Sequence, residues 1–184
     1  MSKAALRRTL GAERRGLGAE AREAAASALV ERLIAIVRAG VVLGFAPIRS
    51  EIDLRPALDR ISRHQPVALP RMEGPDLVPV PLVSWEALVV GRFGVREPSG
   101  APLPVVHTVL TPGLGFTAAG ARLGYGGGFY DRFFTAHPRA LRIAVGFDLQ
   151  LVDRLPTEPH DAPVDVVVTP GGTLWTGARG RSAP

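Results

Sequence analysis

The chain has 184 residues, of which 46% are hydrophobic and 21% charged, a composition typical of a globular protein. This length favours one domain, and no apolar run reaches the roughly 18 to 20 residues that a membrane-spanning helix needs. The absence of cysteine excludes disulfides, thiolate metal ligands and a cysteine nucleophile, while the net charge of +5 suits a protein that binds polyanions.

The N-terminal segment, residues 2–39, is rich in Ala, Leu, Arg and Glu, which predicts one or two helices with a break near residues 16–18. Lys3, the only lysine of the chain, and Arg7 would lie one helical turn apart, where both could converge on one anion. A phosphate site would favour the compact ammonium of Lys3, although codon preference near the start explains it equally well. Because no apolar signal core follows the first residues, we expect a cytoplasmic protein.

Short apolar runs then alternate with helical patterns. Runs at residues 41–45, 67–69, 77–80, 105–110, 141–146 and 164–169 predict strands, and helices are expected after Asp53 and from about residue 129 to residue 135. This alternation predicts an α/β fold with a mainly parallel sheet covered by helices on both faces. We expect a single domain over residues 1–170 and a flexible tail over residues 171–184, which lack periodicity.

A glycine-rich loop at residues 124–128 precedes the second of these helices. Consecutive glycines let backbone N–H groups point at one ligand, and the positive end of the helix adds to them, so the loop suits phosphate. It matches neither of the common nucleotide-binding glycine patterns, and a plain surface turn is the alternative. Its neighbours favour a nucleotide and metal site beside an aromatic pocket: Arg122, Tyr125, Phe129, Tyr130 and Asp131.

Five segments in order resemble one known signature: Lys3–Arg7, Ser50–Asp53, Phe93–Pro98, residues 112–116 with 122–131, and His160–Asp165. Together they resemble the 5-formyltetrahydrofolate cyclo-ligase family, with the likeness extending from residue 3 to about residue 169. The resemblance implies a three-layer α/β fold and an enzyme that converts 5-formyltetrahydrofolate to 5,10-methenyltetrahydrofolate with ATP and Mg²⁺. The formyl oxygen would attack the γ-phosphate and N10 would then close the ring, so no protein nucleophile is required.

The resemblance also implies residue roles on the nucleotide side. Contacts to ATP are expected from the basic side chains, the loop glycines and two aromatic residues: Lys3, Arg7, Arg122, Gly124, Tyr125, Gly126, Gly127, Gly128 and Phe129. Asp131 is the expected Mg²⁺ ligand, with Asp165 as a second carboxylate. Asp131 could instead cap its helix, and Asp165 could simply begin a strand.

On the substrate side, Glu51, Phe93 and Tyr130 would line the folate pocket, while Arg122, Tyr130 and Asp131 would act in catalysis. Phe93 could equally fill the core. Two positions depart from the family pattern, because Thr117 stands where an acidic residue is common and Pro170 where glutamate is common.

The partner expected from this reading is a small-molecule substrate, 5-formyltetrahydrofolate with or without a polyglutamate chain. We expect a monomer without a membrane partner. No nucleic-acid partner is expected either, because the basic residues are spread along the chain without a Lys/Arg block. The alternatives are a phosphate-binding or nucleic-acid-binding module and a sugar-phosphate isomerase, neither of which would respond to folate.

Overall fold

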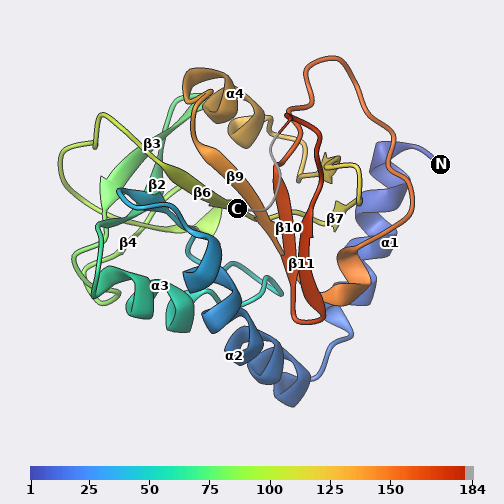
Figure 1. Ribbon diagram of the computed structural model, residues 1–184, viewed down its shortest axis with the longest axis horizontal. Helices are drawn as coiled ribbons and strands as arrows, with labels where there is room; N and C mark the ends of the chain where they lie inside the picture. Colours follow the sequence, from blue (N-terminus) through green and yellow to red (C-terminus); the bar gives the residue numbers. More distant parts are fainter. Residues whose placement is uncertain (181–184) are drawn as a thin grey trace.

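A seven-stranded sheet forms the centre of the computed structural model, which describes residues 1–180 (Figure 1). Its order is β11-β10-β9-β6-β1-β2-β3. The strands are β1 (Val42–Leu43), β2 (Val67–Glu73), β3 (Asp76–Pro81), β6 (Thr108–Thr111), β9 (Leu141–Val145), β10 (Val166–Thr169) and β11 (Gly172–Trp175). The inner pairs are parallel, and the outer pairs β2/β3 and β10/β11 are antiparallel.

Four helices and two short hairpins complete the fold. The helices are α1 (Lys3–Arg15), α2 (Ala19–Ile36), α3 (Arg55–Ser62) and α4 (Phe129–Ala136), with 3₁₀ turns η1 (Arg92–Gly94) and η2 (Asp148–Gln150). The hairpins pair β4 (Val89–Val90) with β5 (Arg96–Glu97) and β7 (Gly115–Phe116) with β8 (Arg122–Leu123). Within residues 1–180, no helix is long and apolar enough to cross a membrane.

The N-terminal helices break where the sequence predicts. The Ser2 hydroxyl accepts a hydrogen bond from the Ala5 N–H at 3.3 Å and so caps the start of α1. The helix ends at Gly16, and α2 begins directly after Gly18, whose backbone is extended. Two glycines within three residues thus separate the helices, because each weakens helix continuation.

Helices cover both faces of the sheet. Alternate side chains of a strand point to opposite faces, and Val42 accordingly packs in the cluster that contains Leu33 of α2 and Leu58 of α3, whereas the next residue, Leu43, packs with Phe134 of α4. In Figure 1, α2 and α3 lie at the bottom of the view and α4 at the top. Burying one such leucine or phenylalanine stabilises the fold by about 1.5–3 kcal/mol. The predicted three-layer α/β fold is confirmed.

The expected C-terminal tail needs a correction. Residues 172–175 form β11, which pairs with β10 from Val166↔Trp175 to Thr169↔Gly172. Four residues are too few to show a strand period, and the hydrogen bonds that order them come from β10. The remainder of the predicted tail includes residues 181–184, which lie outside the described residues.

The strand order places several predicted site segments together. The parallel neighbours β1 and β6 end at Leu43 and Thr111, so the turn that carries Glu51 and the loop at residues 112–116 both follow carboxyl ends of the sheet. Ligands of open parallel sheets bind at this edge. Helix α1 reaches the same edge, because Arg14 donates to the carbonyl oxygen of Gly113.

Candidate active site

The glycine loop between β8 and α4 has free donors and occupied acceptors. No N–H group of residues 124–128 donates a hydrogen bond to another described residue. The Gly124 carbonyl instead accepts from Arg7 Nε at 2.8 Å, and the Gly127 carbonyl accepts from Arg132 Nη2 at 3.1 Å. Gly126, with φ +102°, has a backbone conformation that side chains disfavour. The loop therefore presents donors to an anion while arginines hold its carbonyls.

Arg122 lies beneath this loop on β8. Its side chain is 5% exposed, and Nη2 contacts Asp131 Oδ1 at 3.0 Å. The guanidinium carbon also lies 5.5 Å from the centroid of the Tyr130 ring. The buried Nε has no hydrogen-bond partner among the described residues. A guanidinium with a spare donor and one carboxylate partner suits a site that receives phosphate.

Asp131 occupies the first turn of α4 and is linked to the C-terminal loop. Besides Arg122, its Oδ1 accepts from the Ala162 N–H at 3.2 Å. The side chain is 19% exposed, and no hydrogen bond within the described residues engages Oδ2. One carboxylate oxygen is thus left for a cation, which fits Mg²⁺ bound mainly through phosphates and water.

Lys3 and Arg7 lie on the same helix but contact different segments. Lys3 Nζ lies 2.6 Å from Asp161 Oδ2 and 3.1 Å from Glu158 Oε2, whereas Arg7 contacts Gly124. Partial burial lowers the pKa of Lys3, but the hydrogen bonds and charges of the two carboxylates outweigh it and hold the pKa above its ordinary value. The pair does not share one partner here, because Arg7 contacts the glycine loop and Lys3 contacts the C-terminal loop, which is linked to α4 through the Ala162 N–H and Asp131.

Glu158, His160 and Asp161 form the one group of three carboxylate or histidine side chains within residues 1–180 that is close enough to hold a metal. Lys3 Nζ already contacts two of them. This group therefore carries an ion pair with Lys3, and the structure gives no reason to assign it a metal.

Glu51 is buried under the glycine loop. Its Oε1 accepts from the Tyr125 hydroxyl at 2.5 Å, and its Oε2 accepts from the Ile48 N–H at 3.0 Å. Burial raises the pKa of Glu51, although these two hydrogen bonds and nearby arginines counteract it. The pKa of Tyr130 is also raised, chiefly by burial and in addition by the negative charge of Glu51. Glu51, Tyr125 and Tyr130 thus form one group.

Phe93 and Phe129 are both associated with arginines at the surface. Phe93 is 66% exposed in η1, so the alternative that it fills the core is wrong. Its φ of +58° is unusual for a side-chain-bearing residue, and Arg92 lies over its ring at 5.0 Å. Phe129 begins α4, with Arg132 over its ring at 5.2 Å. The exposed ring of Phe93 and the partly buried ring of Phe129 are thus each held by a cation, and such rings can receive a planar ligand.

Asp165 does not fit the expected metal role. Its side chain has no exposed surface, and Oδ2 accepts from Arg179 Nη1 at 2.9 Å and from the Arg142 N–H at 2.9 Å. The carboxylate thus links the start of β10 to β9 and to Arg179, and it has no exposed oxygen to offer a metal ion. We therefore assign Asp165 a structural role, which corrects the expectation.

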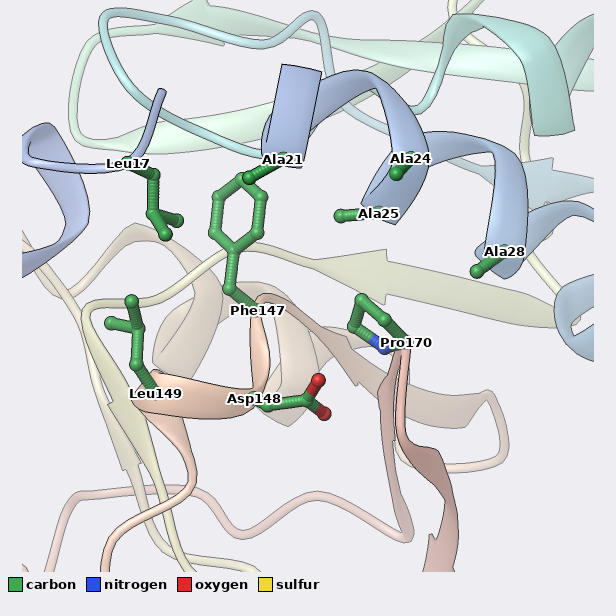
Figure 2. Close-up of a pocket in the computed structure, with 9 residues that line it drawn as sticks. All are labelled: Leu17, Ala21, Ala24, Ala25, Ala28, Phe147, Asp148, Leu149 and Pro170. Atoms are coloured by element: carbon green, nitrogen blue, oxygen red, sulfur yellow. The ribbon is translucent and has the colours of Figure 1, made fainter. Parts of the chain in front are cut away.

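A groove of about 530 Å³ lies apart from these residues, between α2 and η2 (Figure 2). It is lined by Leu17, Ala21, Ala24, Ala25, Ala28, Phe147, Asp148, Leu149 and Pro170. None of the predicted site residues lines it, and Figure 2 shows one carboxylate, Asp148, among apolar side chains. The groove offers no chemistry for phosphate or folate.

Comparison with known proteins identifies the family to which this site belongs. The chain matches the 5-formyltetrahydrofolate cyclo-ligase family over residues 1–170. The chain belongs to that family. The 5-formyltetrahydrofolate cyclo-ligase of Escherichia coli K12 is 32% identical, with 76% of this chain and 82% of that protein covered. The 5-formyltetrahydrofolate cyclo-ligase of Mycolicibacterium smegmatis is 42% identical over a match that covers 50% of this chain and 53% of that protein.

Solved structures agree with the sequence comparison. The 5,10-methenyltetrahydrofolate synthetase of Aquifex aeolicus superposes with a TM-score of 0.85 at 31% identity, covering 100% of this chain and 97% of that one. Members of the cyclo-ligase family convert 5-formyltetrahydrofolate to 5,10-methenyltetrahydrofolate using ATP. The predictions of family and enzyme class are therefore confirmed.

The two departures from the cyclo-ligase pattern lie outside the glycine loop. Thr117 is buried in the β7–β8 turn, where its hydroxyl accepts from the Ala121 N–H at 3.1 Å. Pro170 ends β10 and lines the groove of Figure 2. Thr117 thus stabilises a turn.

One residue in the group around Glu51 was missed by the sequence analysis. Arg14 is 3% exposed and donates to the Tyr125 hydroxyl at 2.9 Å. A signal exists in the sequence, because Arg14 lies one turn after the buried Leu10 and so on the apolar face of α1. A charged residue in an apolar stripe indicates a buried polar partner.

Proposed function

We propose that this chain itself catalyses the ATP-dependent closure of 5-formyltetrahydrofolate to 5,10-methenyltetrahydrofolate, with the site between α1, the glycine loop and the turn that carries Glu51. The observation that supports this most directly is that no described residue accepts a hydrogen bond from the N–H groups of residues 124–128, a loop whose Gly124 lies against the Arg122 guanidinium. Such donors bind phosphate without reorganisation, which is how phosphoryl transfer is mostly accelerated.

On the nucleotide side, the loop N–H groups, Lys3, Arg7 and Arg122 bind the ATP phosphates, and Tyr125 and Phe129 border that site. Arg122 stabilises the negative charge that develops as the formyl oxygen takes the γ-phosphoryl group. Lys3 leaves Asp161 and Glu158 for the phosphates when ATP binds, because a phosphate offers a compact ammonium more charge than two partly solvated carboxylates. The protein contributes position and charge, and no covalent intermediate with it is required.

On the substrate side, Glu51 accepts hydrogen bonds from N–H groups of the pteridine ring, while Tyr130 and Phe93 border its plane. A buried carboxylate whose two oxygens already accept one hydrogen bond each retains lone pairs for such donors. N10 is held against the activated formyl carbon by this binding, which makes the ring closure effectively intramolecular.

Mg²⁺ is the proposed metal, and Asp131 would hold it. The fit rests on the carboxylate oxygen of Asp131 that no described residue engages, next to the loop that would bind the phosphates. When bound, Mg²⁺ would neutralise phosphate charge. Asp131→Asn keeps the shape but loses the charge, so the Mg²⁺ concentration needed for half-maximal rate should rise by roughly tenfold. An unchanged Mg²⁺ titration would leave Asp131 with its Arg122 contact alone.

The central test mixes purified protein with 5-formyltetrahydrofolate and MgATP. The methenyl chromophore should form with ADP and phosphate released in equal amounts, and omission of either substrate should abolish all three products. ATP hydrolysis that ignores folate would contradict the proposal. The proposal would also be contradicted if the folded protein formed no product from 5-formyltetrahydrofolate.

The remaining features of the proposal concern the cellular form of the enzyme. We propose a cytoplasmic monomer that accepts the folate with or without a polyglutamate chain. Sedimentation at several concentrations tests the monomer, and Michaelis constants for mono- and triglutamate substrates test the tolerance of the chain. A mass that doubles with concentration would contradict the first part.

A further inference from the structure

Arg14 is a buried cation held mainly by neutral groups. Near the end of α1, its guanidinium donates to Ser50 Oγ at 3.1 Å, to the Gly113 carbonyl at 3.1 Å and to the Tyr125 hydroxyl at 2.9 Å. Within residues 1–180 it forms no direct ion pair. Burying a charge without a carboxylate partner is costly. The contacts of Arg14 indicate what this buried charge does.

The hydrogen bonds around Tyr125 have a fixed direction. A guanidinium only donates, so the Tyr125 hydroxyl accepts from Arg14 and its single proton is left for Glu51. That proton points to Glu51 Oε1, 2.5 Å away. Arg14 therefore polarises the Tyr125 hydroxyl, which then donates a stronger hydrogen bond to the Glu51 carboxylate. We call Arg14, Tyr125 and Glu51 the relay.

The relay also joins the two sides of the site. Arg14 belongs to α1, Tyr125 to the glycine loop and Glu51 to the turn after β1. The Ile48 N–H holds the other oxygen of Glu51, so the carboxylate plane is fixed from two directions. A movement of the glycine loop would therefore shift the Tyr125 hydroxyl and, with it, the hydrogen bond that holds Glu51.

We propose that Arg14 is a positioning residue, which acts through the Tyr125 hydroxyl to keep the Glu51 carboxylate ionised and oriented toward the pteridine N–H groups. This inference rests on the proposed role of Glu51 in folate binding. Hydrogen bonds polarise one another along such a chain, so the effect of Arg14 reaches a group that it does not touch.

The charged and titratable groups around Glu51 support this assignment. Burial raises the pKa of Glu51, whereas the Tyr125 and Ile48 hydrogen bonds and the charges of Arg14 and Arg49 lower it. The Tyr130 hydroxyl is also affected by this carboxylate, whose negative charge adds to the effect of burial in raising the pKa of Tyr130. Loss of Arg14 removes one of the opposing charges, so the pKa of Glu51 should rise further and the protonated form, a poorer acceptor, should persist to higher pH.

Four single variants and one double variant test the relay: Arg14→Met, Tyr125→Phe, Glu51→Gln, Arg22→Met and the combination of the first two. Arg22 is the matched control, because it donates to the backbone carbonyls of Leu17, Ser50 and Arg14 and so braces the same junction without contacting Tyr125 or Glu51. Each purified variant is assayed for its Michaelis constants and for the pH profile of kcat/KM for 5-formyltetrahydrofolate.

Arg14→Met should raise KM for the folate by about tenfold, as expected when a charged hydrogen-bond partner is lost, with KM for ATP much less affected. The acid limb of the pH profile should move to higher pH in Arg14→Met and Tyr125→Phe but stay in place in Arg22→Met. Adding Arg14→Met to Tyr125→Phe should have little further effect, because both act on Glu51 through the same hydroxyl.

An acid limb that stays in place in both Arg14→Met and Tyr125→Phe would overturn the relay and leave Arg14 as a packing residue. If Arg14→Met does not fold, Tyr125→Phe alone decides, since it removes only one oxygen. Full folate affinity in Glu51→Gln would instead overturn the proposed role of Glu51, whatever the other variants do.

Discussion

The two sides of the site differ in how far the protein has already satisfied their polar groups. At the glycine loop, no residue among 1–180 accepts a hydrogen bond from the N–H groups of residues 124–128, and residues 125–127 are exposed. At Glu51, both carboxylate oxygens accept hydrogen bonds and the residue is buried. The proposed folate side therefore has its polar groups satisfied within the protein, whereas the donors of the proposed phosphate side await an anion from the ligand.

Removing Arg122 should affect the phosphate side most. Arg122→Met is expected to lower kcat by about 10² to 10³-fold, because a charge aimed at the transferring phosphoryl group is lost. The measurement is steady-state formation of the methenyl product at saturating substrates. Arg132→Met is the matched control, since Arg132 also lies over an aromatic ring next to the loop but on its exposed side, and its effect should be much smaller. Equal losses would contradict a special role for Arg122.

Gly126 tests whether the loop conformation matters beyond its stability. Gly126→Ala puts a side chain at φ +102° and within 3.4 Å of the Arg7 guanidinium. We expect kcat/KM for ATP to fall by about a hundredfold, as displaced phosphate donors would cause. Gly74→Ala is the control, because Gly74 has φ +60° in open space on the β2–β3 turn.

Both glycine variants should lose about 1 kcal/mol or somewhat more in the free energy of unfolding, measured by urea titration. If Gly74→Ala lost as much activity as Gly126→Ala, the activity would depend on stability, and the contrast between the two sides would lose its basis.

Lys3 should have a moderate effect that is confined to ATP. Lys3→Met is expected to raise KM for ATP by about tenfold while folate binding without nucleotide changes little, since one phosphate contact is lost. Arg8→Met on the exposed face of α1 serves as the control for charge alone. A normal KM for ATP in Lys3→Met would favour codon preference as the reason for the only lysine.

The smallest expected effect concerns stability and pH on the folate side. Burial raises the pKa of Glu51 above its ordinary 4.5, so the folded chain binds this proton more tightly than the unfolded chain does. The free energy of unfolding therefore decreases as pH rises from the unfolded pKa through the folded one. Glu51→Gln should be more stable than the parent at about pH 8 and show no such gain at about pH 4, by urea titration. An equal gain in the free energy of unfolding at both pH values would show that it does not come from the raised pKa of Glu51.

The sequence was sufficient for elements whose signal is local. Apolar runs such as residues 141–146 predicted buried strands, and the glycines near residue 17 predicted the break between α1 and α2. Strand β11 was missed because its four residues gain their hydrogen bonds only from β10. A strand that is stabilised mainly by its partner strand is hard to predict from its own amino-acid composition.

The site was predictable where neighbours in sequence carry it, as in the loop from Arg122 to Asp131. Arg14 was missed because its partners Ser50, Gly113 and Tyr125 are 36, 99 and 111 residues away. Asp165 was misassigned for the same reason, since the arginine that occupies its carboxylate oxygen lies in the segment expected to be a tail. Resemblance to a family suggests which residues form the site, but it does not show which of their charges are already paired with another side chain of the same protein.

The outer strands of the sheet have a consequence for the behaviour of the protein at high concentration. In β3, Pro79 and Pro81 have no N–H to offer a neighbouring chain, and the Pro79 carbonyl accepts from the Leu103 N–H at 2.7 Å. At the opposite edge, β11 is only four residues long, and it covers the apolar β10. Short edges and edges without donors are poor templates for strand addition between molecules, so this sheet should resist edge-to-edge aggregation.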